Sequence, residues 1–384
     1  MQPAQLPSKI VFAHSLRGIA ALIVVIGHIA QVFWTLPSIN TMIGSPPFAP
    51  KPYWFTIAVD SMLPAGFLQH FPVALFFIIS GFVIPFSLID RSRLQFAISR
   101  FLRLWPTYAI GLSISCIFII ICANWFGAAQ PFSWHTYMLQ LLFVRDLAWV
   151  PSIDGVVWTL EIEAKFYVLM LLLAGPLRAG RIWPLILTAF ALLCLTVGAV
   201  SLPGWLKSGE PIYQFLYGMT LSAQMMCFMF IGTAFNFYYR GLISLRITII
   251  SAILFFLALA AQWPIGTIQL LYVSGLTSYA IAAIVFALAF IWRGKAQQPW
   301  PGLNWLANIS YPRYVIHAVA GWALMRMALD AGWGLGPVLT LGFSFGFLAA
   351  VALHYWVERP TQALGKRLAA RLGASSARPT AVNG

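Results

Sequence analysis

Long apolar stretches alternate with short polar segments along the whole chain. A helix that crosses a bilayer needs about 20 mostly apolar residues. By that criterion we find ten predicted spans, with centres near Leu22, Phe77, Ser115, Met170, Leu192, Phe228, Phe255, Ile284, Val319 and Phe347. The pattern therefore predicts an all-α, polytopic membrane helix bundle with about ten transmembrane helices.

Basic residues concentrate in every second loop between the predicted spans. Arg91 and Arg93 follow the second span and Arg178 follows the fourth, whereas the opposite loops contain few cations. Because Lys and Arg gather in cytoplasmic loops, this alternation predicts that both termini are cytoplasmic. We expect a membrane domain over residues 1–372 and a polar, disordered cytoplasmic tail over residues 373–384.

The composition agrees with a membrane protein. The 384 residues are 61% hydrophobic and 8% charged, whereas soluble domains carry about 25% charged residues. The net charge of +14 does not indicate nucleic-acid binding, because the basic residues lie in short clusters between apolar stretches. The 6 histidines lack metal-ligand spacing and carboxylates are scarce, so we expect no metal site.

The first predicted span carries Arg17 and His28 on an otherwise apolar helix. At about 100° and about 1.5 Å per residue, they lie within about 20° of one face and about 16 Å apart. Arg17 alone could snorkel to lipid phosphates, and His28 alone could hydrogen-bond a neighbouring helix. Their shared face favours function instead, with Arg17 binding the phosphates of a ligand and His28 acting as a general base.

The fourth predicted span begins with three charged residues, Glu161, Glu163 and Lys165. Glu161 and Lys165 are spaced i, i+4 and can neutralise each other. Glu163 points to another face of the helix. It could orient a histidine, contact substrate, or pair with a basic residue of another span, such as Arg313 or Arg326.

Polar groups also lie in or beside three other predicted spans. Arg100 and Arg103, one turn apart, suit a phosphate clamp at the cytoplasmic surface, although orientation signals need no ligand. Ser80 precedes a glycine, and such small residues let helices pack closely. Arg313 and His317, one turn apart, place a second polar spot inside the bundle.

Together these segments resemble the acyltransferase-3 family of integral membrane acyltransferases. Six motifs occur in the family's order: Arg17-x10-His28, Phe76-Phe-x-x-Ser-Gly-Phe82, Arg103-Leu-x-Pro-x-Tyr108, Trp158-Thr-Leu-x-x-Glu163-x-x-Phe-Tyr167, Tyr311-Pro-x-Tyr-x-Ile-His317 and Val357-Glu-Arg-Pro360. The resemblance implies a ten-helix bundle, a catalytic His28 and a donor-binding Arg17. It also implies a stand-alone member without a fused esterase-like domain.

The resemblance further implies transfer of an acyl group, foremost acetyl, from cytoplasmic acyl-CoA to a hydroxyl of a surface glycan or lipid-linked sugar. We expect His28 and Glu163 to be catalytic, with Glu163 orienting the histidine. The expected donor-binding residues are Arg17, Arg100, Arg103 and Ser80. The expected acceptor-binding residues are Trp158, Tyr167, Tyr314 and His317. No permanently bound cofactor is expected, and the setting would be the lipid bilayer of the bacterial inner membrane.

Four positions depart from the family pattern. His14 stands where an aspartate that could pair with Arg17 is usual, Ala164 and Lys165 stand where a second acid and a glutamine are common, and Arg313 replaces a leucine. These departures leave the Arg17 and His28 pair intact. The residues themselves also leave open a proton-coupled transporter or flippase, in which the buried histidine and glutamate would relay protons.

Overall fold

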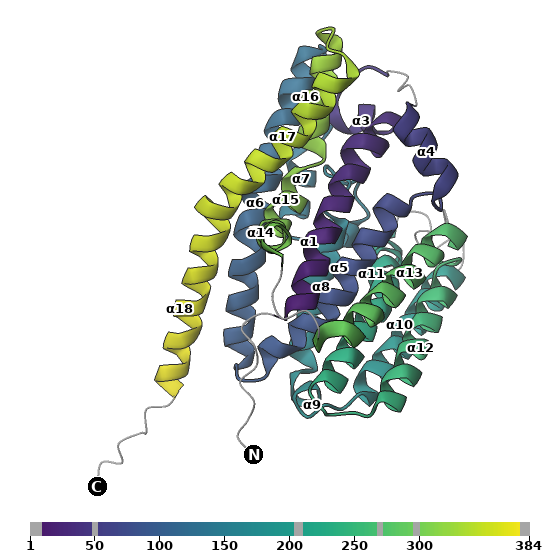
Figure 1. Ribbon diagram of the computed structural model, residues 1–384, viewed down its shortest axis with the longest axis vertical. Coiled ribbons are helices and arrows are strands. Elements are labelled where there is room, and N and C mark those ends of the chain that lie inside the picture. The colour runs from purple at the N-terminus through teal and green to yellow at the C-terminus, as the bar shows by residue number, and fades with distance from the viewer. Residues whose placement is uncertain (1–9, 48–52, 203–209, 267–271, 295–299, 377–384) are drawn as a thin grey trace.

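The computed structural model describes residues 10–47, 53–202, 210–266, 272–294 and 300–376. Within these residues the chain folds into helices without strands, which confirms the predicted all-α bundle (Figure 1). The first helix begins and the last helix ends toward the same end of the bundle.

Eight of the described helices are long and apolar enough to cross a membrane. They are Val11–Thr35 (α1, η1 and α2), Phe67–Leu88 (α5 and η2), Arg93–Trp125 (α6), Trp183–Ser201 (α10), Pro211–Tyr239 (α11), Leu245–Gln262 (α12), Tyr272–Gly294 (α13 and η5) and Leu335–Leu372 (α17, η6 and most of α18). Each coincides with one of the predicted spans. The chain is therefore a multi-pass membrane protein.

The other two predicted spans are short or interrupted. The fourth is only the 15-residue α8 (Trp158–Leu172) followed by α9 (Ala174–Arg178). The ninth is split into α15 (Ser310–Ile316) and α16 (Val319–Asp330), with Ala318 at φ −88° and ψ −88° between them. Non-helical backbone is tolerated at membrane depth where protein surrounds it, and most of α15 and α16 is buried.

Five shorter helices complete the described structure: α3 (Ile39–Ile43), α4 (Trp54–Met62), α7 (Trp134–Leu141), η3 (Asp146–Ala148) and α14 (Pro301–Asn308). The helix α18 (Arg359–Ser376) runs four residues past 372, the expected end of the membrane domain. The expected boundary between membrane domain and tail stays a prediction, and residues 377–384 lie outside the described residues.

The backbones of α5 and α11 touch at small residues. A Cβ added to Gly81 would lie 1.9 Å from the carbonyl oxygen of Met229, and one added to Gly232 would lie 2.1 Å from that of Ile78. Across the same contact, the Thr233 hydroxyl donates to the carbonyl oxygen of Gly81 at 3.0 Å. This confirms the close packing predicted from the Ser-Gly pair and holds α5, a wall of the candidate site, against the core.

Two ion pairs with little exposure join α8 to the segment before it. Arg145 binds Glu161 at 2.6 Å, and Lys165 binds Asp146 at 2.8 Å. Our predicted pair of Glu161 with Lys165 is therefore wrong, since Lys165 reaches only the backbone carbonyl of Glu161, at 3.3 Å. The segment before α8 supplies the partners instead, and the two positive and two negative charges balance inside the protein.

Candidate active site

Two adjoining cavities lie between α1, α5, α6, α8 and α15. The first, of about 60 Å³, is lined by polar and aromatic residues of five of the six sequence motifs and by apolar neighbours such as Val73. The second, of about 370 Å³, shares Arg17, Arg103, Ser310 and Tyr311 with the first. Because four residues line both cavities, they form two parts of one site.

The shared region of the two cavities is cationic. Arg17 of α1 and Arg103 of α6 both line it, and neither makes a hydrogen bond or an ion pair with another described residue. Glu163 of α8 lines the first cavity beside them and accepts a hydrogen bond from the Tyr167 hydroxyl. Two guanidinium groups facing one carboxylate leave a positive charge, which suits an anionic ligand.

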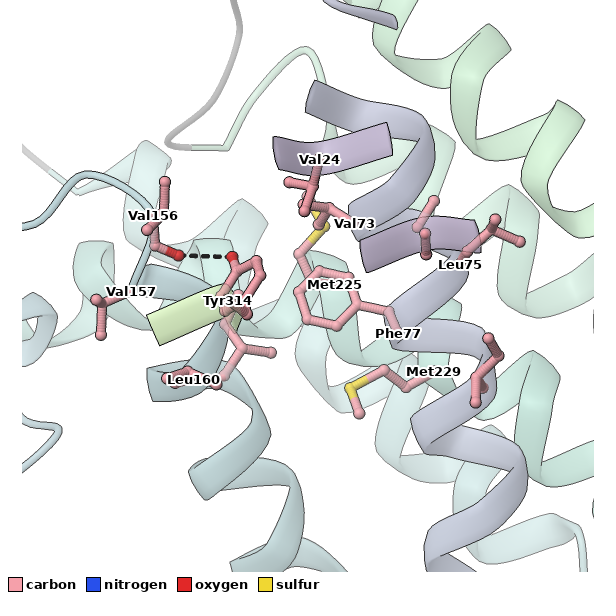
Figure 2. Close-up of a cluster of buried hydrophobic side chains, with 14 of the residues drawn as sticks. Val24, Val73, Leu75, Phe77, Val156, Val157, Leu160, Met225, Met229 and Tyr314 are labelled. Carbon is pink, nitrogen blue, oxygen red and sulfur yellow. Dashed lines mark hydrogen bonds between the residues drawn. The ribbon is translucent and has the colours of Figure 1, made fainter. Parts of the chain in front are cut away.

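The opposite end of the first cavity is apolar. Val73 and Phe77 of α5 and Leu160 of α8 line it together with Tyr314 of α15, and Figure 2 shows the Tyr314 ring facing these side chains. The Tyr314 hydroxyl donates to the carbonyl oxygen of Val156 at 2.6 Å and accepts from the Thr159 hydroxyl at 2.7 Å. These two bonds hold the ring as an end wall of the cavity.

His28 lies beyond that wall, at the start of the π-helix η1 (Gly27–Val32). It is 8% exposed and lines neither cavity. Its Nδ1 donates a hydrogen bond to the carbonyl oxygen of Val24 at 2.7 Å. Since a carbonyl oxygen only accepts, Nδ1 carries the hydrogen and Nε2 of the neutral ring carries the lone pair. That lone pair is the one a general base requires.

The widened turn of η1 is supported by side chains that bind its carbonyl oxygens. Trp322 Nε1 donates to the carbonyl oxygen of His28 at 3.1 Å, and Trp34 Nε1 to that of Ile29 at 3.1 Å. The Tyr53 hydroxyl donates to the carbonyl oxygen of Ala30 at 2.6 Å. Single π-turns inside α-helices are frequent at functional sites, and these donors satisfy the carbonyls that such a turn displaces.

A second histidine lies against the first. The ring centroids of His28 and His317 are 5.0 Å apart with the rings nearly perpendicular, and the Tyr314 ring lies 5.9 Å from that of His317. His317 follows α15 at the interruption before α16 and is 0% exposed. Tyr314 therefore separates the cationic cavity from a pair of imidazoles.

The structure brings six of the ten predicted site residues to the cavity, namely Arg17, Ser80, Arg103, Glu163, Tyr167 and Tyr314. Arg100 and Trp158 do not line either cavity. The Arg100 guanidinium is buried, donates to the Ser87 hydroxyl, and lies over two aromatic rings, 5.4 Å from that of Tyr167. Of the two arginines, only Arg103 thus lines the cavities, and the clamp that we expected from the pair stays a prediction.

The orienting role that we expected for Glu163 belongs to a backbone group. His28 Nδ1 is bound by Val24, whereas Glu163 lies among the cavity arginines. Neither predicted alternative partner of Glu163 pairs with it, because Arg326 binds Asp330 at 3.7 Å. Arg313 is 5% exposed, and its Nε and Nη1 have no partner among the described residues.

The lining of the second cavity includes residues that sequence reasoning missed. His354 Nδ1 binds Glu358 at 2.6 Å, and Gln362 donates to the same carboxylate at 2.9 Å. All three line the cavity with His14. The repeated i, i+4 spacing of polar residues at the end of the last span was the available signal.

Comparison with known proteins gives one family. The family model described as an acyltransferase domain, Acyl_transf_3, matches residues 10–359. No curated protein and no solved structure matches the chain.

Proposed function

Because the chain belongs to the acyltransferase-3 family, we propose that it moves a short acyl group, foremost acetyl, from acyl-CoA to a hydroxyl of a surface glycan or lipid-linked sugar. Its setting would be the bacterial inner membrane, with both termini cytoplasmic. One observation carries the proposal: Arg17 and Arg103, which bind no other described residue, line a cavity whose Tyr314 lies beside the His28 and His317 pair.

The donor would enter through the larger, more polar cavity. Phosphates of CoA would bind Arg17 and Arg103, since guanidinium groups recognise phosphate oxygens with paired donors. The pantetheine arm would then extend past Ser80 toward the apolar end of the smaller cavity, where Phe77 and Leu160 can cover the thioester. Glu163 would limit the local excess of positive charge and hold Tyr167 in place.

His28 would act as the general base. Its Nε2 takes the proton of the acceptor hydroxyl while the hydroxyl oxygen attacks the thioester carbonyl carbon. The C–S bond of the tetrahedral intermediate then breaks, an ester forms, and the CoA sulfur takes the proton back from the imidazolium. Since His28 does not line the cavity in this structure, the Tyr314 ring must move aside for the thioester to reach it.

The decisive experiment compares His28→Ala with His70→Ala in membranes that contain equal amounts of inserted protein. His70 is a matched control, because its ring centroid lies 6.1 Å from that of Trp263 and it lines neither cavity. Mass spectrometry of surface glycans measures the acyl groups added. Loss of a general base lowers the rate about 10²–10⁴-fold, so His28→Ala should abolish acylation and His70→Ala should keep it. Persistent acylation in His28→Ala would refute the mechanism.

A further inference from the structure

The two histidines have the same protonation geometry. His317 Nδ1 donates to the carbonyl oxygens of Arg313 at 3.0 Å and Tyr314 at 2.9 Å, as His28 Nδ1 donates to that of Val24. In both neutral rings Nε2 is therefore a hydrogen-bond acceptor. The backbone fixes both tautomers, so this place in the bundle presents two lone pairs at once.

Neither lone pair is used by the described residues. His317 Nε2 is buried without a hydrogen-bond partner, and no described residue donates to His28 Nε2. Two neighbouring side-chain donors are already committed, since Trp322 donates to the carbonyl oxygen of His28 and Tyr314 to that of Val156. Buried polar atoms are satisfied in nearly all folded proteins. A ligand that brings two donors would satisfy both imidazoles.

The surroundings restrict the charge of that ligand. Arg313 lies one turn before His317, is 5% exposed, and has no carboxylate partner among the described residues. A buried cation beside the pair repels an ammonium group. A carboxylate has no hydrogen to donate to two acceptor nitrogens. Within the described chain, no third His, Cys, Asp or Glu completes a metal-binding group with the pair.

We propose that the imidazole pair is the acceptor subsite and that it selects a 1,2-diol, two free hydroxyls on adjacent sugar carbons. This inference rests on the proposed function and names the acceptor chemistry more closely. One hydroxyl donates to His28 Nε2 and is the one acylated, while its neighbour donates to His317 Nε2 and fixes the orientation of the sugar. Both donors are neutral, and adjacent carbons let them reach two rings whose centroids are 5.0 Å apart.

The same geometry explains how the product would leave. Acylation replaces one O–H donor by an ester oxygen, which only accepts hydrogen bonds. An ester oxygen that faces the lone pair of a histidine nitrogen forms no hydrogen bond there, and its loss of hydration costs free energy. The product therefore binds more weakly than the substrate, and a diol is acylated once rather than twice.

Periodate oxidation tests the proposal, because periodate cleaves the carbon–carbon bond between two adjacent free hydroxyls and leaves it intact when one of the two is acylated. Surface glycans are prepared from a strain that carries the chain and from the same strain without it. Mild alkali then removes O-linked acyl groups. We expect periodate consumption of the glycan from the strain with the chain to rise after alkali by at least one equivalent for each acyl group removed. No rise with acyl groups present would overturn the diol inference and leave the proposed function standing.

The other outcomes are equally distinct. Equal acyl content in the two strains would refute the proposed function itself. An acyl group that resists alkali would place it on nitrogen and overturn both claims about the acceptor hydroxyls. These readouts do not depend on which sugar is acylated, and they use the wild-type protein in its own membrane.

A variant of His317 separates ligand binding from a structural role. His317→Phe keeps an aromatic ring and removes both nitrogens, with His70→Phe as the matched control. We expect total acylation to fall at least tenfold. We also expect a smaller periodate protection per acyl group, which is the rise in periodate consumption for each acyl group that alkali removes, because the neighbouring hydroxyl is no longer selected. A merely destabilised protein would lower total acylation and leave the protection per acyl group unchanged, which would contradict the role of His317.

Discussion

The two arginines that precede Trp105 give a sharp test of the donor site. They are one turn apart and look equivalent in sequence, yet only Arg103 lines the cavities. In Arg103→Gln the cavity loses one guanidinium that forms no ion pair with a described residue. A hydrogen bond to a charged group contributes about 1.5–3 kcal/mol, and about 1.4 kcal/mol corresponds to tenfold in affinity. We therefore expect CoA to bind about 10- to 150-fold more weakly.

Arg100→Gln is the matched control for that measurement. It removes the same charge from the same helix, but its guanidinium is bound to Ser87 and lies over the Phe96 ring at 5.5 Å. The variant should lose thermal stability and keep its affinity for CoA. Equilibrium dialysis of detergent-solubilised protein against labelled CoA gives both dissociation constants at a low and a high salt concentration.

Salt provides a second readout of the same prediction. Exposed charge pairs are screened as ionic strength rises, so the dissociation constant of the wild-type protein should increase with salt and that of Arg103→Gln should increase less. An equal loss of affinity in both variants would refute the reasoning, because it would mean that both arginines contact the donor. So would unchanged binding by a folded Arg103→Gln protein.

Three further outcomes test the fold around the site. Gly81→Ala should lower the melting temperature in detergent strongly, since its Cβ would lie 1.9 Å from a backbone oxygen of α11, whereas Gly198→Ala, with no atom within 4 Å, should not. Glu161→Gln should cost about 3–5 kcal/mol by leaving Arg145 without its buried partner, measured by denaturant unfolding. Burial raises the pKa of Asp154 to about 7. Ionisation of that carboxyl therefore destabilises the fold, and the free energy of unfolding should fall as pH rises from about 4 to about 7. Asp154→Asn should remove up to about 4 kcal/mol of this pH dependence. An unchanged pH profile in the variant would contradict the assignment.

The periodicity of apolar residues was sufficient to predict most of the fold. Eight predicted spans are long helices because a bilayer requires that length and hydropathy from any helix that faces lipid. The same rule does not apply to α15, which other helices bury almost entirely, or to the first half of α8, whereas Val168 and Leu172 at the end of α8 are exposed. Hydropathy alone could not reveal which of these residues other helices cover.

The site was predicted where a local pattern decides it and missed where tertiary packing decides it. The shared helix face of Arg17 and His28 follows from helix geometry alone. The divergence of Arg100 from Arg103 depends on Ser87 and the rings around it, and the partner of Lys165 depends on the position of Asp146. Contacts of this kind join segments whose separation no helical period encodes.

Two irregular stretches of helix meet at the proposed reaction centre. The π-turn begins one residue before His28, and the interruption between α15 and α16 begins at His317. A helix in a membrane can give up its regular hydrogen bonds only where other donors replace them, and Trp322 supplies one such bond, to the carbonyl oxygen of His28. In regular helices, the helical repeat alone would fix the position of each imidazole. The interruptions instead let two histidines from separate helices lie with their ring centroids 5.0 Å apart, and this places both imidazoles at the proposed reaction centre.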